Sequence, residues 1–268
     1  MPLATVNGQK VYYEVGGEGE MAVLLHGAYA DADIMEAPAT GLASGFRVLR
    51  FDRRGHGRSA PLTEPISLSD EANDVAQLLD WFGAQAAHLL SHDEGSEVAI
   101  EFALAHPDRT LSLALLAPTV EGFAWDPLVS SWRSEIDMSM AAETKKTIDE
   151  MWLPSPIFDL TREKEGMFDR VAAMYRRYNG SPSRFPRVST SVLPQSSRLT
   201  EIQCPTLILV GDRDEPDRLR CAEFLADSIP GAELVTFPGL SHFLHIEESR
   251  PVMRRLTDFY IPEGDIER

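Results

Sequence analysis

One stretch of the sequence places a carboxylate where it can do chemistry. Residues 88–107 read HLLSHDEGSEVAIEFALAHP, in which a short apolar run is followed by apolar residues at helical spacing. This pattern predicts a strand, a sharp turn and a helix, with Asp93 at the apex and the small residues Ser91 and Gly95 two positions to either side. A carboxylate with an ordinary pKa of about 3.9 is ionised at neutral pH, so Asp93 needs no base before it attacks an electrophilic carbon.

Strand and helix patterns alternate on both sides of this turn. Asn7-Gly8 predicts a hairpin across residues 6–15, at an edge of the sheet. Further strands are predicted at 21–25, 46–51, 111–116, 205–210 and 233–237, and helices at 69–82, 219–228 and 251–259. This alternation predicts a mostly parallel, doubly wound α/β sheet.

The alternation of strand and helix patterns stops between about Thr119 and Gln195. This segment is richer in Met, Trp, Tyr and charged residues and has no strand-like run. We therefore predict one α/β core formed by residues 1–118 and 196–268, with residues 119–195 inserted as a helical cap.

The net charge and the cysteine count limit the partners and cofactors that we expect for this protein. A formal net charge of −17 repels phosphate backbones and anionic membrane surfaces, so we expect a small-molecule substrate rather than nucleic acid or a membrane. The 2 cysteines form neither a disulfide framework nor a complete zinc site, and we expect no metal or other cofactor. With no signal-peptide pattern and no long apolar run, we expect a cytoplasmic protein that is a monomer or a homodimer.

Four segments in this order resemble the α/β-hydrolase superfamily: LLHGAY, FDRRGHGRS, SHDEGS with its helix, and CPTLILVGDRDEP followed by FPGLSHFLHIEES. The resemblance implies Asp93, Asp214 and His242 as nucleophile, acid and histidine. An aspartate at this turn resembles the epoxide hydrolases and the haloalkane and haloacid dehalogenases. The cap and the length are more similar to small lactonase-type and esterase-type members, which usually carry serine there.

Because the Asp93 nucleophile is already ionised, the histidine is not needed to activate it and acts in a later step. We predict that Asp93 attacks an sp³ carbon and forms an alkyl-enzyme ester, which His242, oriented by Asp214, then hydrolyses by activating water. The backbone N–H groups of Ala28 and Glu94 are the predicted oxyanion hole for this second step.

Several carboxylates in the sequence could be the acid that pairs with His242. Asp212, Glu215 and Asp217 share one loop with Asp214, and the spacing from Gly211 favours Asp214. Some related enzymes carry the acid after the preceding strand, which points to Glu121.

The substrate prediction depends on the cap. Tyr175 and Tyr178 are spaced i, i+3 on a predicted helix, so we expect them to share a face and to protonate an epoxide oxygen, with Tyr29 as a further candidate. Glu94, directly after the nucleophile, disfavours a departing halide. The cap tryptophans are expected to line an apolar pocket: Trp125, Trp132 and Trp152.

These observations favour epoxide hydrolysis of a hydrophobic small molecule. Three alternatives remain open: a dehalogenase, an ester or lactone hydrolase with Asp93 as the base for water, and a ligand-binding protein of the same fold without activity.

Overall fold

The chain forms one eight-stranded sheet in the order β1-β2-β4-β3-β5-β6-β7-β8, in a computed structural model that describes residues 1–261. The strands β3 to β8 pair in parallel, whereas β1 and β2 form the predicted antiparallel hairpin and β2 joins β4. The strand bounds are β1 Leu3–Val6, β2 Gln9–Gly16, β3 Glu20–Leu25, β4 Phe46–Phe51, β5 Ala87–His92, β6 Thr110–Leu116, β7 Thr206–Gly211 and β8 Glu233–Phe237. The α/β prediction is confirmed.

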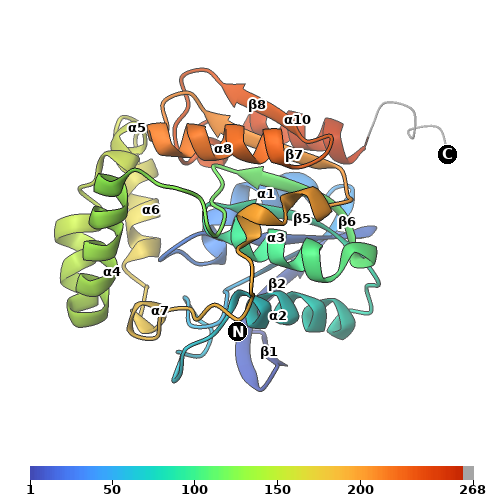
Figure 1. The fold of residues 1–268 in the computed structure, drawn as a ribbon, viewed down its shortest axis with the longest axis horizontal. Helices are drawn as coiled ribbons and strands as arrows, with labels where there is room; N and C mark the ends of the chain where they lie inside the picture. The colour runs from blue at the N-terminus through green and yellow to red at the C-terminus, as the bar shows by residue number, and fades with distance from the viewer. Residues whose placement is uncertain (262–268) are drawn as a thin grey trace.

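Helices cover both faces of the sheet, as a parallel sheet requires. The helices α2, α3 and α8 pack with one face, and α1, α9 and α10 pack with the other (Figure 1). Their bounds are α1 Glu36–Leu42, α2 Leu68–Trp81, α3 Gly95–Ala105, α8 Pro216–Ser228, α9 Leu244–Glu247 and α10 Ser249–Tyr260. Every residue of β5 and β7 is buried. This explains the apolar run of β7, whereas β5 also buries the polar residues His88, Ser91 and His92.

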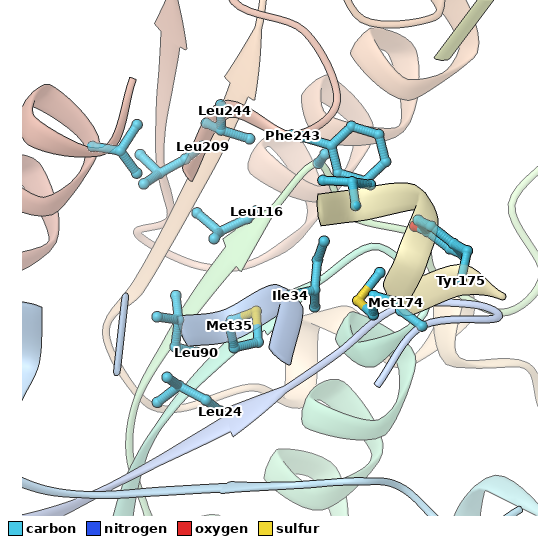
Figure 2. Packing of buried hydrophobic residues seen from close by; sticks show 14 of the residues in the cluster. Leu24, Ile34, Met35, Leu90, Leu116, Met174, Tyr175, Leu209, Phe243 and Leu244 are labelled. Atoms are coloured by element: carbon cyan, nitrogen blue, oxygen red, sulfur yellow. The ribbon is translucent and has the colours of Figure 1, made fainter. Parts of the chain in front are cut away.

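Four further helices lie between β6 and β7, all inside the segment 119–195: α4 Pro127–Thr147, α5 Asp159–Arg162, α6 Met167–Tyr175 and α7 Ser181–Arg184. They stand beside one end of the sheet (Figure 1). Figure 2 shows Met174 and Tyr175 of α6 packing close to Ile34 and Phe243 of the core. We call these four helices the cap helices.

The prediction that Tyr175 and Tyr178 share a helix face is wrong. The helix α6 ends at Tyr175, and Tyr178 lies in the turn that follows it, with its N–H donating to the Tyr175 carbonyl at 2.9 Å. The i, i+3 spacing places two side chains on one face only where the helix continues through both positions.

Within residues 1–261, no helix is long and apolar enough to cross a membrane.

Candidate functional site

Asp93 occupies a strained turn between β5 and α3. Its φ is +51°, in the left-handed region that side chains with a Cβ rarely adopt. Two glycines make room for it: a Cβ on Gly27 would lie 2.7 Å from Asp93 Oδ2, and a Cβ on Gly95 would lie 2.6 Å from the Leu25 carbonyl oxygen. The predicted strand, turn and helix are therefore present, with the side chain of Asp93 held away from both elements.

One predicted oxyanion-hole donor already binds Asp93. The N–H of Ala28 donates to Asp93 Oδ2 at 3.0 Å. The N–H of Glu94, at the start of α3, donates to no other group in residues 1–261. The Ala28 N–H, in the turn after β3, therefore contacts the carboxylate, whereas the Glu94 N–H makes no hydrogen bond to it.

His242 contacts Asp214 among the candidate acids. Its Nδ1 lies 3.2 Å from Asp214 Oδ2, and both side chains are buried. Asp212 instead accepts from Gly239 N–H at 2.7 Å, and Glu121 pairs with Gln195. Asp214, the third residue after Gly211, is therefore the carboxylate of this loop that bonds to the histidine.

Two side chains hold the backbone around His242. Buried Glu247 accepts from the N–H of Ser241 at 2.6 Å and from the N–H of Phe243 at 3.3 Å. His92, the residue before Asp93, bonds through Nε2 to the His242 carbonyl at 3.0 Å. Burial lowers the pKa of His92 well below its usual value, so this ring is a neutral donor.

A fourth charged group completes the site, and sequence reasoning missed it. Arg218, in the first turn of α8, is 2% exposed, and its Nη2 lies 2.6 Å from Asp93 Oδ1. Burial alone would raise the pKa of Asp93, but Arg218 above all, then His242, outweighs it and holds this pKa well below its usual range. The sequence did hold one indication of this role: Arg218 is a cation in the first turn of a helix, where the helix dipole favours anions.

A cavity of about 30 Å³ adjoins Asp93. Tyr29, Trp132 and Trp152 line it, together with groups that the sequence had not singled out for it: Arg133, Ile136, Asp137, Ile157, Glu215 and Arg218. Charged side chains make up half of the lining, so this cavity is not the apolar pocket that we expected.

The other aromatic candidates lie elsewhere. Trp125 sits below the guanidinium groups of Arg133 and Arg218, 4.6 and 5.3 Å from its ring centre. Tyr175 packs against Phe158 and Phe243 in the core (Figure 2). Neither residue lines the cavity beside Asp93, although burial first and the nearby Asp93 second raise the pKa of Tyr175 well above its usual value.

A second cavity of about 220 Å³ shares the walls at Ala28, Tyr29, Glu94 and Asp137 but does not include Asp93. Tyr178 lines this outer cavity, and its hydroxyl bonds to Ser183.

Three contacts engage the two carboxylates of this shared wall. The hydroxyl of Tyr29 donates to Asp137 of α4. Glu94 faces Arg187 at 3.5 Å and Arg53 at 3.8 Å. The carboxylate that follows the nucleophile is therefore already balanced by cations.

No group of three or more His, Cys, Asp or Glu side chains suited to a metal ion occurs in the part of the chain that the structure describes.

Known proteins share this arrangement of elements. Over 92% of its length, the chain is 29% identical to a 2-hydroxy-6-oxononadienedioate/2-hydroxy-6-oxononatrienedioate hydrolase of Pseudomonas putida, covering 90% of that protein. It is 26% identical to a putative carbamate hydrolase of Azorhizobium caulinodans, with 90% of this chain and 91% of that protein covered.

A crystal structure of a hydrolase from Pseudomonas aeruginosa superposes with a TM-score of 0.83 at 26% identity, covering 97% of both chains. The family model described as alpha/beta hydrolase fold matches residues 23–249, which include Asp93, Asp214 and His242. The chain therefore belongs to the α/β-hydrolase family and is a hydrolase of that fold.

Proposed function

We propose that this hydrolase uses Asp93 to displace a leaving group from an sp³ carbon through an alkyl-enzyme ester. The observation that carries this proposal is the geometry of Asp93: an ionised carboxylate at a strained apex, beside a small cavity, and near enough to the His242–Asp214 pair for His242 to lower its pKa. A carboxylate that replaces the usual serine attacks alkyl carbon well, whereas attack on an acyl carbon gives an unstable mixed anhydride.

The two oxygens of Asp93 have different environments. Oδ2 accepts the hydrogen bond of Ala28, so it is the atom that becomes the ester carbonyl oxygen. Oδ1 forms an ion pair with Arg218 and receives no hydrogen bond from the backbone of residues 1–261, so it is the oxygen that we assign to the attack. In the first step the Oδ1–carbon bond forms, the bond from carbon to the leaving group breaks, and its electron pair departs with that group.

Water then cleaves the ester. His242 takes a proton from water, the hydroxide attacks the ester carbonyl carbon, and the N–H groups of Ala28 and Glu94 stabilise the oxyanion. Collapse of this intermediate releases the product alkoxide, which takes the proton back from His242, and leaves Asp93 as a carboxylic acid. This acid then loses its proton to solvent for a displaced halide, or to the alkoxide of an opened epoxide, which restores the Asp93 carboxylate.

The environment of Asp93 argues against its use as a base in ester or lactone hydrolysis. A general base works best with a pKa near the working pH. Arg218 and His242 hold the pKa of Asp93 far below that. A stabilised anion of this kind takes protons from water poorly but still attacks alkyl carbon.

A halide is the leaving group that the cavity favours. The indole Nε1–H of Trp152 is buried and has no hydrogen-bond partner in the described residues, and this tryptophan lines the cavity beside Asp93. Such a donor solvates a halide. Glu94 repels a departing halide less than expected, because Arg187 and Arg53 face that carboxylate.

Epoxide opening is the second candidate, and Tyr29 in the cavity wall is the observation for it. Opening needs an acid for the ring oxygen. Burial first and Asp137 second raise the pKa of Tyr29 well above its usual value, which makes it a weak donor. Tyr178 lies on the outer cavity and α6 ends at Tyr175, so the two tyrosines do not act as a pair from one helix face.

The test is intact-mass spectrometry of the His242→Ala variant after incubation with chloroalkanes, chloroacids, epoxides and lactones. Loss of the water-activating base should trap the alkyl-enzyme ester, and peptide mapping should place it on Asp93. The adduct mass identifies the leaving group. The matched control is His242→Ala with Asp93→Asn, which should stay unmodified. Turnover of a lactone by the wild type without any adduct would overturn the proposal, and a lack of both would favour a ligand-binding protein.

A further inference from the structure

Arg218 has more hydrogen-bonding capacity than Asp93 uses. Its Nη2 contacts Asp93 Oδ1 at 2.6 Å, while its Nε and Nη1 are buried and have no hydrogen-bond partner among residues 1–261. A guanidinium group carries five N–H donors arranged for planar, two-point contact with a carboxylate. Leaving such donors unmatched in the interior is costly, so their position at the cavity wall calls for an anion.

A second cation lines the same cavity. Arg133 of α4 lies over the ring of Trp125, as Arg218 does from the core side. Trp125 therefore positions two guanidinium groups that come from the cap helix α4 and from α8. Stacking fixes the planes of these groups and leaves their edges for hydrogen bonds.

Two carboxylates of the wall have partners of their own, whereas Asp93, Asp214 and Glu215 all act on Arg218. Asp137 accepts from Tyr29, and Glu94 faces Arg187. Glu215 stands at the N-terminus of α8, where the helix dipole stabilises its charge.

We infer that Arg218, supported by Arg133, binds a carboxylate of the substrate, which makes the substrate a small organic acid whose carboxylate is bonded to the reacting carbon. The distance between the substrate carboxylate and the reacting carbon follows from the guanidinium that both carboxylates share. Nη2 of Arg218 touches the nucleophilic Oδ1, and the unpaired Nε and Nη1 lie on either side of it. A carboxylate bound to these donors therefore has its next carbon beside Oδ1. The positive charges also reduce the repulsion between the two carboxylates. This replaces the expected hydrophobic substrate with 2-halo acids or 2,3-epoxy acids.

This inference rests on the proposed function for its chemistry, but binding tests it separately. Propionate and its neutral isostere propionamide are titrated into the wild type and into Asp93→Asn by calorimetry. Asp93→Asn removes a competing anion and frees Arg218, so propionate should bind about tenfold tighter or more, whereas propionamide should not. Adding Arg218→Met to Asp93→Asn should abolish the gain, and adding Arg133→Gln should reduce it.

Thermal unfolding checks that each variant is folded, and Arg218→Lys in the Asp93→Asn background keeps the charge if the methionine variant fails to fold. That lysine variant should retain part of the propionate affinity. Equal binding of propionate and propionamide, or no gain in Asp93→Asn, would overturn the inference.

The reaction gives the second readout. In His242→Ala, 2-chloropropionate should alkylate Asp93 at least about tenfold faster than 2-chloropropionamide, because only the acid is held by Arg218. Alkylation at equal rates overturns the inference and leaves the proposed function standing. Propionate binding that depends on Arg218, without any adduct on Asp93, supports the anion site and overturns the proposed function.

Discussion

Oδ1 of Asp93 lies 2.6 Å from Nη2 of Arg218, and both side chains are withdrawn from solvent. This buried ion pair joins the turn after β5 to the first turn of α8. It places a permanent cation against the atom that we assign as the nucleophile, and it therefore affects both stability and catalysis.

The ion pair should be visible in stability measurements. Arg218→Met leaves a buried carboxylate without its cation and should lower the free energy of unfolding by about 3–5 kcal/mol. The double variant Asp93→Asn with Arg218→Met should recover part of that loss, because neither charge is then buried alone. Urea unfolding of the wild type, the two single variants and the double variant gives the coupling energy between Asp93 and Arg218. Strictly additive effects would show that the two groups do not interact.

The acid should act on the second half of the reaction. Asp214→Asn removes the charge that orients and stabilises His242, and it should slow hydrolysis of the alkyl-enzyme about 100- to 10,000-fold while alkylation of Asp93 continues. Rapid-quench kinetics separates the two steps. Asp212→Asn, in the same loop but bonded to Gly239, is the control and should behave as the wild type. Equal slowing of both steps by Asp214→Asn would contradict this division of roles.

Glu247 should matter for turnover although it touches no reacting atom. Its carboxylate accepts the N–H groups on both sides of His242, so Glu247→Gln should loosen the loop and lower kcat about 10- to 100-fold. The neighbouring Glu248→Gln loses only its contact with Lys164 and should leave kcat unchanged. The pH dependence of the rate should also change in Glu247→Gln, whereas a variant that is only less stable would keep the wild-type pH dependence.

Asp31 should give the protein a pH-dependent stability. Burial, then the charge of Asp52, raises the pKa of Asp31 from 3.8 to about 6. The folded state therefore favours the protonated form, and this stabilisation, about 3 kcal/mol when complete, is present below pH 4 and is lost as the pH rises through 6.

The measurement for Asp31 is the free energy of unfolding between pH 4 and pH 8. Asp31→Asn should flatten the decline with rising pH, because its amide does not titrate. Exposed Asp80→Asn should keep the wild-type slope. An unchanged slope in Asp31→Asn would assign the pH dependence to other groups.

Tyr29→Phe should distinguish the two leaving groups. If halide is displaced, loss of the hydroxyl should change the alkylation rate less than about tenfold, because a halide needs no proton. Epoxide opening assisted by Tyr29 should instead fall about 100- to 10,000-fold. Single-turnover alkylation of His242→Ala with paired chloro and epoxy substrates measures both. Tyr178→Phe, on the outer cavity, is the control.

The sequence alone was sufficient for the parts that depend on local pattern. Alternating apolar runs predicted the parallel sheet, and the sharp turn around Asp93 followed from small residues at fixed offsets. The order of Asp93, Asp214 and His242 along the chain also predicted which loops meet, because the carboxyl ends of parallel strands share one edge of a sheet.

Only the tertiary structure decided what surrounds the nucleophile. Arg218 reaches Asp93 because α8 begins at Pro216, earlier than the apolar pattern indicated, and turns the side chain inward. Tyr175 and Tyr178 separated because α6 ends between them, and helix ends depend on packing and capping more than on periodicity. Substrate contacts come from side chains distant in sequence, whose directions are fixed only when the cap helices pack on the core.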